Sequence, residues 1–499
     1  MELQELLKRL QKLQAERHAY GHASACLYLD SATVAPRGSA EARGVTLGIL
    51  SEKSYQLFVN DDTRALLDAL WERRAELNPP VSRQTELLRE ELDKLTRIPM
   101  EEYVAYTRLI NEAGEKWRAA KEADDYPIFR PLLERIIDSQ RRFAGYIDPT
   151  RPAYDALLND YEKGMDTRTL NSFFSELRQK LVPLIAEVKG RQTVEPAFLT
   201  ARCPVDRQRE LSAYLMDLMG LDRAHCAIAE TEHPFTIGFS KYDMRITTHY
   251  HENAFLSSMF SVIHEGGHAL YEMGIADEHQ FTCLADGAST GMHESQSRFY
   301  ENMVGRSAGF MHFLAPKLRE LFPQPLTGVS DAELFRAANL VRPSLIRTEA
   351  DEVTYPLHIM IRYELEKQLI DGTLSTNDLP AAWNAMYREY LGVDVPNDSA
   401  GVLQDMHWSD GYIGYFPTYA LGSAYAAQFM AALRRELDVD ALLARGELAP
   451  ITAWLGSRVH RFGRLLTPTE LLEEATGEPF VPHYYTDYLS QKVRDVYRV

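Results

Sequence analysis

The sequence predicts a mainly α-helical protein in which residues 1–499 form one large domain with a small β element. Three observations predict this fold class. Apolar residues recur every three or four positions through most of the chain, as they do along the buried face of a helix. Proline, glycine and N-cap residues mark the ends of these segments. No internal repeat or low-complexity linker divides the sequence, so a separable second domain has no support.

Several helices are expected in the N-terminal part. Pro99 precedes a helical run over residues 100–121, and Pro127 and Pro131 are expected to open the next helix, because proline is favoured in the first turn. Two further segments carry leucines at helical spacing. These leucines are Leu3, Leu6, Leu7, Leu10 and Leu13, followed by Leu87, Leu88, Leu92 and Leu95.

Residues 236–250 (TIGFSKYDMRITTHY) break the helical pattern. β-Branched and aromatic residues alternate there with polar ones, which predicts a strand or a small hairpin. Two interpretations stand. The segment is either a structural hairpin that seals a helix end, or an edge strand that faces a substrate, since an exposed edge can pair with an extended peptide.

The remaining signals are helical. Gly164 is expected to end a helix near Tyr161. Residues 411–433 carry no formal charge and are long enough to span a bilayer, but they contain Pro417 and many small residues, which favours a buried helix with a lead-in loop. The sequence Thr467-Pro468-Thr469-Glu470 is a good N-cap with proline in the first turn.

Composition narrows the function classes. The chain has 54 Lys and Arg against 72 Asp and Glu, a formal net charge of −18, so neither a nucleic-acid partner nor an anionic membrane surface is expected. Cys26, Cys203, Cys226 and Cys283 form no C-x-x-C pair, which argues against a disulfide framework and a thiolate metal site. The charged N-terminus does not look like a secretory signal. A cytoplasmic location is therefore expected.

Histidines gather in one region, where eight of the 15 lie between residues 225 and 293. Within it, His264-Glu265-Gly266-Gly267-His268 follows an apolar helical run. A spacing of four places both imidazoles on one helix face, where they can share a metal, and the glutamate is aimed at a water on that metal. Each mid-helix glycine costs about 1 kcal/mol relative to alanine, so the pair predicts close approach by another segment. The alternative is an ordinary amphipathic helix.

A catalytic zinc needs a third protein ligand and an open fourth position. Glu294, 26 residues after His268, opens a second helical run, and a carboxylate on a following helix is typical of zinc peptidases with a glutamate ligand. His293 is the competing ligand. The three-histidine extension of the motif is absent. Glu272 is expected to accept a hydrogen bond from an imidazole N–H rather than to bind the metal.

Six motifs, in sequence order, resemble those of the carboxypeptidase Taq (M32) metallocarboxypeptidases. Several are weak alone, but together they are highly specific, and none departs from the family's pattern. They span residues 233–408, whereas the N-terminal third agrees only in length and helical character. The motifs are His233-Pro234-Phe235; Asp243-Met244-Arg245-Ile246-Thr247; His264 to His268; His293-Glu294-Ser295-Gln296; Ile346-Arg347-Thr348-Glu349-Ala350-Asp351; and Gly401-Val402-Leu403-Gln404-Asp405-Met406-His407-Trp408.

The resemblance implies a helical fold with a deep groove and zinc at its floor, which often forms a homodimer and removes C-terminal residues from peptides with broad specificity. Residues 1–150 are then expected to wall the groove, and residues 225–430 to carry the zinc and substrate site. Cobalt satisfies the same ligands. The implied roles are zinc ligand for His264, His268 and Glu294, and general base for Glu265.

The zinc site also looks like that of the angiotensin-converting-enzyme type of helical peptidase, in which a histidine and a tyrosine steady the tetrahedral intermediate. His407 and Tyr415 occupy similar places in the sequence, with Tyr419 as the alternative phenol. The competing interpretation of His407 is a core histidine bonded to Asp405 or to a backbone carbonyl. A structural role is the alternative for either tyrosine.

A peptidase that acts at the C-terminus must also recognise a free carboxylate, for which arginine is the usual partner. Arg347 is the first choice, because its motif resembles the family's and because it follows Pro343 in a loop-like stretch before a helix from His358 onward. Arg342 is the next choice.

Two more arginines lie near the motifs. Arg245 is a further candidate for substrate binding, although a structural ion pair with Asp243 on the predicted strand is the favoured interpretation. Arg298 lies one helical turn past Glu294 and is expected to support that carboxylate.

Three functions compete at this point. The first is a zinc carboxypeptidase acting on peptides, and the second is a zinc oligopeptidase that cuts internal bonds. The third is a non-catalytic helical scaffold in which zinc only joins two helices. A structural zinc takes four protein ligands, whereas three are evident here and Glu265 is present, so the scaffold is disfavoured.

Overall fold

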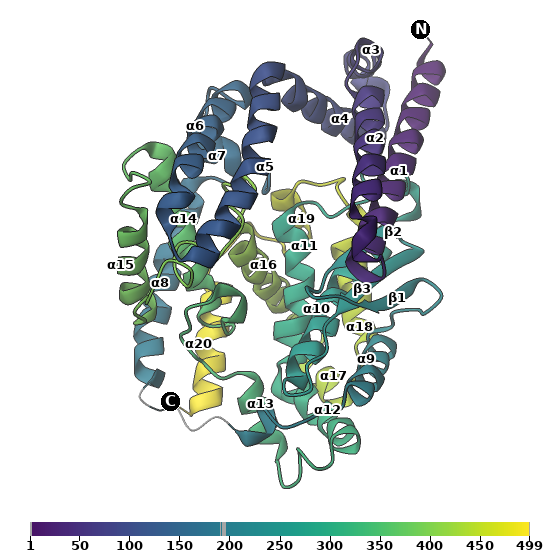
Figure 1. Ribbon diagram of the computed structural model, residues 1–499. Coiled ribbons are helices and arrows are strands. Elements are labelled where there is room, and N and C mark those ends of the chain that lie inside the picture. The colour runs from purple at the N-terminus through teal and green to yellow at the C-terminus, as the bar shows by residue number, and fades with distance from the viewer. Residues whose placement is uncertain (1, 190, 192–195, 499) are drawn as a thin grey trace.

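The structure is a computed structural model of the chain, and residues 2–189, 191 and 196–498 of it are described. The predicted fold class is confirmed, because helices dominate and one small sheet accompanies them (Figure 1). The helices are α1 Leu3–Thr33, α2 Ala40–Phe58, α3 Asp61–Glu72, α4 Pro79–Arg97, α5 Met100–Ala123, α6 Arg130–Ile147, α7 Ala153–Leu158, α8 Thr167–Lys189, α9 Val205–Met219, α10 Phe255–Met273, α11 Thr290–Arg298, α12 Ala308–Leu321, α13 Asp331–Ala338, α14 Tyr355–Asp371, α15 Leu379–Leu391, α16 Pro417–Arg434, α17 Val439–Arg445, α18 Ala449–Arg458, α19 Pro468–Thr476 and α20 His483–Tyr497.

Most helix ends follow the local chemistry of the sequence. Helix α5 begins directly after Pro99, and α6 has Pro131 in its first turn, whereas Pro127 lies in a short 3-10 turn before it. Helix α19 begins with a capping box, in which the Thr467 side chain accepts from the Glu470 amide and the Glu470 side chain accepts from Thr467. One end was misplaced, because α7 stops at Leu158, before the turn that leads to Gly164.

The N-terminal helices have a hydrophobic cluster of their own. Leucines of α1, α3 and α4 pack together with Phe58, separately from the main core. In Figure 1, α4 runs from this group of helices towards α5 and α6. The clustered residues are Leu6, Leu10, Leu13, Phe58, Leu66, Leu67, Leu70, Leu88 and Leu92.

The sheet has three strands, β1 Cys226–Glu230, β2 Thr236–Ser240 and β3 Asp243–Thr248, in the order β1-β3-β2. The predicted hairpin is confirmed, because β2 and β3 pair antiparallel. Strand β1, which the sequence analysis missed, pairs parallel with β3. Strand β3 is therefore the central strand and not an edge, and β2 is the edge strand on the hairpin side.

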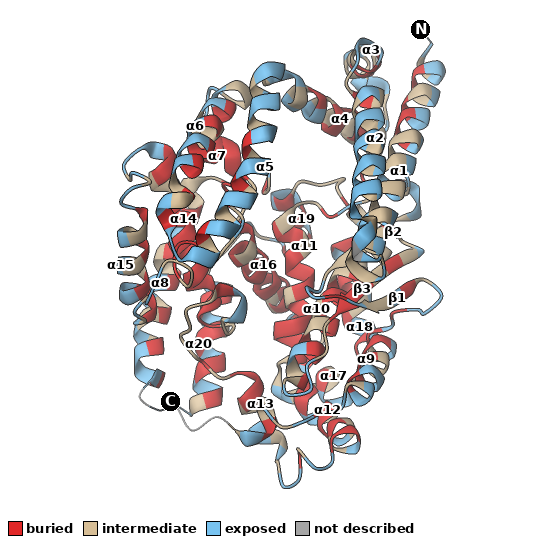
Figure 2. Cartoon of the chain, in the orientation of Figure 1, coloured by how far each residue is buried: buried red, intermediate tan, exposed pale blue. Residues whose placement is uncertain are grey.

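Helices α10, α11 and α16 form the buried centre of the molecule, as the red segments of Figure 2 show. The glycine pair of α10 permits this packing. A Cβ at Gly267 would lie 2.6 Å from the Gln296 carbonyl oxygen, and one at Gly266 would lie 2.7 Å from the Met219 side chain. The close approach predicted from the two glycines is confirmed, and it brings α10 and α11 together.

Residues 417–434 form α16, and almost all of its side chains are buried, as predicted for this uncharged segment. Among the helices that the structure describes, none combines the length and the apolarity that crossing a membrane requires.

Candidate metal centre

A cavity of about 1390 Å³ is lined in part by residues of α10 and α11. Its walls come from distant parts of the chain. They include α4 from Arg83 to Arg97, the segment after α7 from Asn159 to Gly164, and Thr236 at the start of β2. The side chains of Tyr415 and Tyr419 also line the cavity, as do those of His264, His268 and Glu294.

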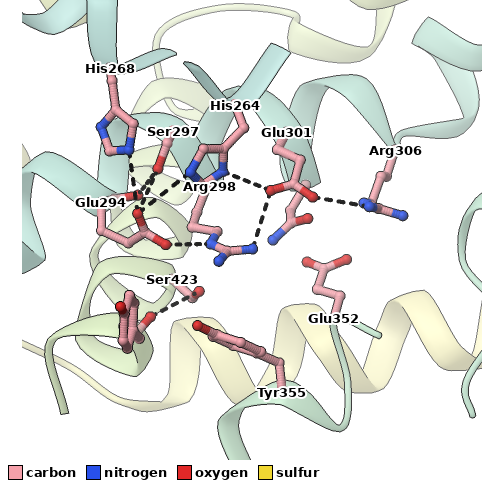
Figure 3. A network of polar contacts seen from close by, with 12 residues as sticks. His264, His268, Glu294, Ser297, Arg298, Glu301, Arg306, Glu352, Tyr355 and Ser423 are labelled. Atoms are coloured by element: carbon pink, nitrogen blue, oxygen red, sulfur yellow. Dashed lines mark hydrogen bonds and ion pairs between the residues drawn. The ribbon is translucent and has the colours of Figure 1, made fainter. Parts of the chain in front are cut away.

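The three predicted metal ligands converge. His264 and His268 come from α10 and Glu294 from α11, and one donor atom of each lies within 4.8 Å of the others. The Nε2 atoms of the two histidines lie 3.7 and 3.5 Å from Glu294 Oε2 (Figure 3). Donors bound tetrahedrally at about 2.0–2.1 Å from zinc are separated by about 3.3 Å. Two imidazole nitrogens, one carboxylate oxygen and an open cavity side therefore fit a catalytic metal.

Charged side chains behind the candidate ligands form hydrogen bonds and ion pairs with two of them (Figure 3). Arg298 Nε donates to Glu294 Oε1 at 2.7 Å, as expected from the sequence. Glu301 was missed. Its Oε2 lies 2.9 Å from His264 Nδ1, and it also accepts from Arg298 and Arg306. Such a carboxylate fixes the orientation of an imidazole ligand.

One signal for Glu301 was present in the sequence. It lies seven residues after Glu294, two helical turns along the same face. The segment Phe299–Gly305 is a π-helix that continues α11, and π-helical turns are frequent at functional sites. Together the arginines around Glu301 keep the pKa of its buried carboxyl well below the ordinary value, despite the opposing effect of burial.

His293 lies behind His268 and is not part of the converging group. Its Nδ1 is 2.6 Å from His268 Nδ1, and its Nε2 is 3.1 Å from Glu272 Oε1. If His268 binds metal through Nε2, its Nδ1–H donates to His293, which in turn donates to Glu272. Glu272 thus accepts an imidazole hydrogen bond as predicted, but from His293.

Glu265 is buried beside His264 and lines the cavity. The Thr236 hydroxyl lies 2.7 Å from Glu265 Oε2 and 2.9 Å from the Glu265 carbonyl oxygen, so β2 orients the carboxylate. Burial raises the pKa of Glu265, and the nearby His264 and the Thr236 hydrogen bond only partly offset this effect. Thr236 was not identified from the sequence.

The two predicted oxyanion donors differ in access. Tyr415 lines the cavity and packs against Tyr419 and Tyr161. His407 does not line the cavity; its Nε2 lies 3.3 Å from the Tyr419 hydroxyl and its ring packs against Phe416 at a tilt. Its buried Nδ1 has no partner among the described residues, so the bond to Asp405 considered above is not present. Burial lowers the pKa of His407 to about 4.

Arg347 is buried behind Tyr419. Its guanidinium donates to Asp405 Oδ1 at 2.9 Å and to the Tyr355 hydroxyl at 3.2 Å, and it lies 5.2 Å from the centre of the Tyr419 ring. Asp405 also accepts from Arg362. Tyr419, and not Arg347, faces the cavity. A contact between Arg347 and substrate stays a prediction.

Arg245 forms the ion pair expected with Asp243, with N···O distances of 2.6 and 2.9 Å, and its guanidinium lies over the Phe239 ring. It lies on the central strand and is not among the cavity-lining residues. Arg245 therefore forms the structural ion pair expected from the sequence, and a contact between Arg245 and substrate stays a prediction.

Comparison with known proteins gives one consistent result. The family model of the carboxypeptidase Taq (M32) metallopeptidases matches residues 9–493. Carboxypeptidase 1 of Bacillus subtilis is 39% identical over 99% of this chain and 97% of its own length. Thermostable carboxypeptidase 1 of Thermus thermophilus is 40% identical over 82% of each chain.

A solved structure agrees over the whole length. The crystal structure of an M32 carboxypeptidase from Deinococcus radiodurans R1 superposes with a TM-score of 0.96 at 35% identity, covering 99% of this chain and 100% of that one. Both the sequence and the arrangement of its elements therefore match the same group of proteins.

Proposed function

The chain belongs to the carboxypeptidase Taq (M32) metallopeptidase family and is a metallocarboxypeptidase, and we propose that it uses zinc to remove C-terminal residues from peptides with broad specificity. One observation carries the proposal. Donor atoms of His264, His268 and Glu294 converge within 4.8 Å on the wall of a large cavity, with Glu265 beside them.

The donor set supports zinc. Imidazole and carboxylate ligands suit zinc, and three protein ligands with an open position distinguish a catalytic site from a structural one. Bound there, zinc supplies a Lewis acid for the scissile carbonyl and makes water more acidic. Cobalt is proposed as a working substitute. The scaffold alternative has no fourth protein ligand among the described residues.

Glu265 is proposed as the general base. Thr236 donates to one of its oxygens, which leaves the other to take a proton from the attacking water. Burial raises its pKa, so the protonated carboxyl formed in this step is stabilised until it passes the proton to the leaving amine. Helix α10 places this carboxylate next to His264, so the proposed base lies beside the proposed metal site.

Tyr415 is proposed as the main donor to the developing oxyanion, because its side chain reaches the cavity. Burial raises the pKa of its phenol, so the hydroxyl keeps its proton at neutral pH and can donate it in a hydrogen bond. His407 acts through Tyr419, to which it is hydrogen-bonded.

Arg347 is proposed to bind the C-terminal carboxylate of the substrate. The Arg347 side chain is only 7% exposed, and Tyr419 lies between it and the cavity. Binding therefore requires the Tyr419 ring to move aside. Arg362 then continues to neutralise Asp405, because both arginines contact that carboxylate.

A cytoplasmic location and a homodimer are part of the proposal. All four cysteines are free thiols, which suits a reducing compartment. The homodimer follows from the family resemblance, and light scattering of the purified protein tests it with an expected mass of about twice 56.9 kDa.

Metal reconstitution tests the proposed function. The purified protein should contain close to one zinc per chain, lose peptide hydrolysis when zinc is removed by a chelator, and regain it with zinc or cobalt. Full hydrolysis by protein shown to be free of metal would refute zinc dependence. Stoichiometric zinc without peptide hydrolysis would return the scaffold alternative.

A further inference from the structure

Two glutamates that the mechanism does not use are completely buried. Glu162, between α7 and α8, and Glu366, on α14, are both 0% exposed, and neither forms an ion pair with a described residue. A buried carboxylate without a cation is costly, so each must be held by hydrogen bonds. Each accepts three.

Glu162 is bonded to the start of α11. Its Oε2 accepts from the Gly291 amide at 3.0 Å, and its Oε1 accepts from the Ser289 hydroxyl at 2.9 Å and from the Tyr425 hydroxyl at 3.0 Å. Ser289 is the N-cap of α11. A carboxylate at this point satisfies a free amide of the first turn and interacts favourably with the helix dipole.

The contact of Glu162 with α11 bears on the metal centre. Gly291 lies one turn before Glu294 on the same helix face. A Cβ at Gly291 would lie 2.5 Å from Glu162 Oε2, so the Glu162 side chain packs directly against the α11 backbone, with no room for a side chain at Gly291. A shift of the first turn would carry Glu294 with it. Glu162 therefore fixes the end of the helix that bears the third metal ligand.

Glu366 is bonded to the other half of the site. Its Oε1 accepts from Trp408 Nε1 at 2.8 Å, and its Oε2 accepts from the Gly414 amide at 2.9 Å and from the Tyr154 hydroxyl at 2.8 Å. Trp408 directly follows His407, and Gly414 directly precedes Tyr415. One carboxylate thus holds both ends of the loop that runs from His407, which is hydrogen-bonded to Tyr419, to the proposed oxyanion donor Tyr415.

We propose that Glu162 and Glu366 are positioning residues with separate tasks, Glu162 for the metal ligand Glu294 and Glu366 for the loop that bears His407 and Tyr415. This inference rests on the proposed function. Neither carboxylate touches the cavity; each acts through the backbone and side chains that it holds.

A carboxylate suits both tasks better than an amide does. Trp408 Nε1–H and the Gly414 amide point at different oxygens of Glu366, so a glutamine there would turn its N–H₂ group towards a donor that cannot accept. At Glu162 the Gly291 amide takes one oxygen, so a glutamine would turn its N–H₂ group towards Ser289 and Tyr425, whose hydroxyls would have to change from donor to acceptor. Burial raises the pKa of both carboxyls to about 7, and the three hydrogen bonds to each carboxyl only partly offset this effect.

The test compares Glu162→Gln with Glu366→Gln, which serve as matched controls because both remove a buried carboxylate with three hydrogen bonds. Zinc affinity is measured by competition with a chromogenic chelator, and kcat and KM are measured at saturating zinc. Glu162→Gln should weaken zinc binding about 10-fold and leave kcat within about threefold of wild type. Glu366→Gln should leave zinc affinity within about twofold and lower kcat about 10-fold or more with little change in KM.

A second pair keeps the carboxylates and removes one donor from each. Tyr425→Phe should reproduce the zinc effect of Glu162→Gln, and Tyr154→Phe the kcat effect of Glu366→Gln, each at about threefold. If both pairs change zinc affinity and kcat in parallel, or change neither, the assignment of separate tasks is wrong. A wild-type protein that binds no zinc or does not hydrolyse peptides would instead refute the proposed function.

Discussion

The chemistry proposed for Glu265 depends on one side chain and its partner. Glu265→Gln preserves the size of the side chain and the acceptor for Thr236, but an amide cannot take a proton from water. We expect zinc content to stay at the wild-type level and kcat to fall by about 10³-fold. Metal analysis and steady-state kinetics on the same preparation check this. Turnover near the wild-type value would exclude Glu265 as general base.

The third ligand is also decided by single residues. Glu294→Ala leaves two ligands for the metal, so stoichiometric zinc should be lost. His293→Ala removes only the group behind His268, and zinc should bind about 10-fold more weakly but still stoichiometrically at high concentration. Zinc titration of both variants is the measurement. The opposite pattern would make His293 the ligand.

At the scale of elements, the glycine pair of α10 determines how closely α11 approaches. Gly267→Ala would place a Cβ 2.6 Å from the Gln296 carbonyl and 2.8 Å from Ser297 Cα, both backbone atoms that cannot move alone. We expect the free energy of unfolding to fall by about 2–3 kcal/mol, as for other overpacked cores. Chemical denaturation monitored by circular dichroism measures this.

The matched control is Gly114→Ala in α5, where an added Cβ meets no heavy atom within 4 Å. Alanine is the better helix former, so this variant should be more stable than wild type by about 0.5–1 kcal/mol. If Gly267→Ala is as stable as Gly114→Ala, the packing of α10 on α11 is looser than the structure shows.

Much of the helical architecture could be predicted because its signals are local. The capping box of α19, the proline in the first turn of α6 and the leucine spacing of α1 and α4 lie within a few residues of one another. Strand β1 was missed because its pairing with β3 joins segments 18 residues apart, as in Cys226 with Met244, and a five-residue segment carries little signal of its own.

The residues of the candidate site likewise fall into those that the sequence could predict and those that it could not. The candidate ligands on α10 and α11 follow from helical periodicity and from the family motifs, so the sequence could predict that these side chains converge. Thr236 lies 29 positions from Glu265, and Glu162 lies 129 positions from Gly291. Such contacts depend on how elements pack, and no spacing rule within one segment predicts them. The burial of Arg347 behind Tyr419 is of the same kind.

For the molecule as a whole, the buried carboxyls predict a pH dependence of stability. The pKa of Glu366 in the folded protein is about 7, above its ordinary value of 4.5, because burial disfavours the charged form. The folded state therefore binds more protons than the unfolded state between these values, and stability from this group falls as pH rises from about 4.5 to about 7.

Glu366→Gln removes this titration. The free energy of unfolding of the variant minus that of wild type should therefore rise by about 2–3 kcal/mol from pH 5 to pH 8, since each pKa unit corresponds to about 1.4 kcal/mol. Denaturant unfolding at both values, with chelator present so that metal binding does not enter, gives the difference. A constant difference between variant and wild type would show that Glu366 titrates normally.

At the scale of the whole molecule, the cavity brings distant parts of the chain together around the site. It lies between α4, which shares the N-terminal hydrophobic cluster, and the buried helices α10 and α11. Ion pairs connect α4 to the segment after α7, as Lys94 with Asp160 at 2.8 Å and Lys163 with Glu90 at 2.7 Å. These ion pairs hold α4 against the segment after α7 at this wall of the cavity.

The most direct test of metal-dependent trimming from the C-terminus is a timed digest followed by mass spectrometry. A peptide with a free C-terminal carboxylate and its C-terminally amidated twin are incubated with zinc-loaded protein. We predict a ladder of products that lose residues from the C-terminus of the free acid. The amide should be cut at least 30-fold more slowly, because it carries no anion for the Arg347 guanidinium to bind and a desolvated charge pair of this kind is worth roughly 2–5 kcal/mol. Arg347→Met should abolish most of this preference. Internal fragments from both peptides at equal rates would contradict trimming from the C-terminus.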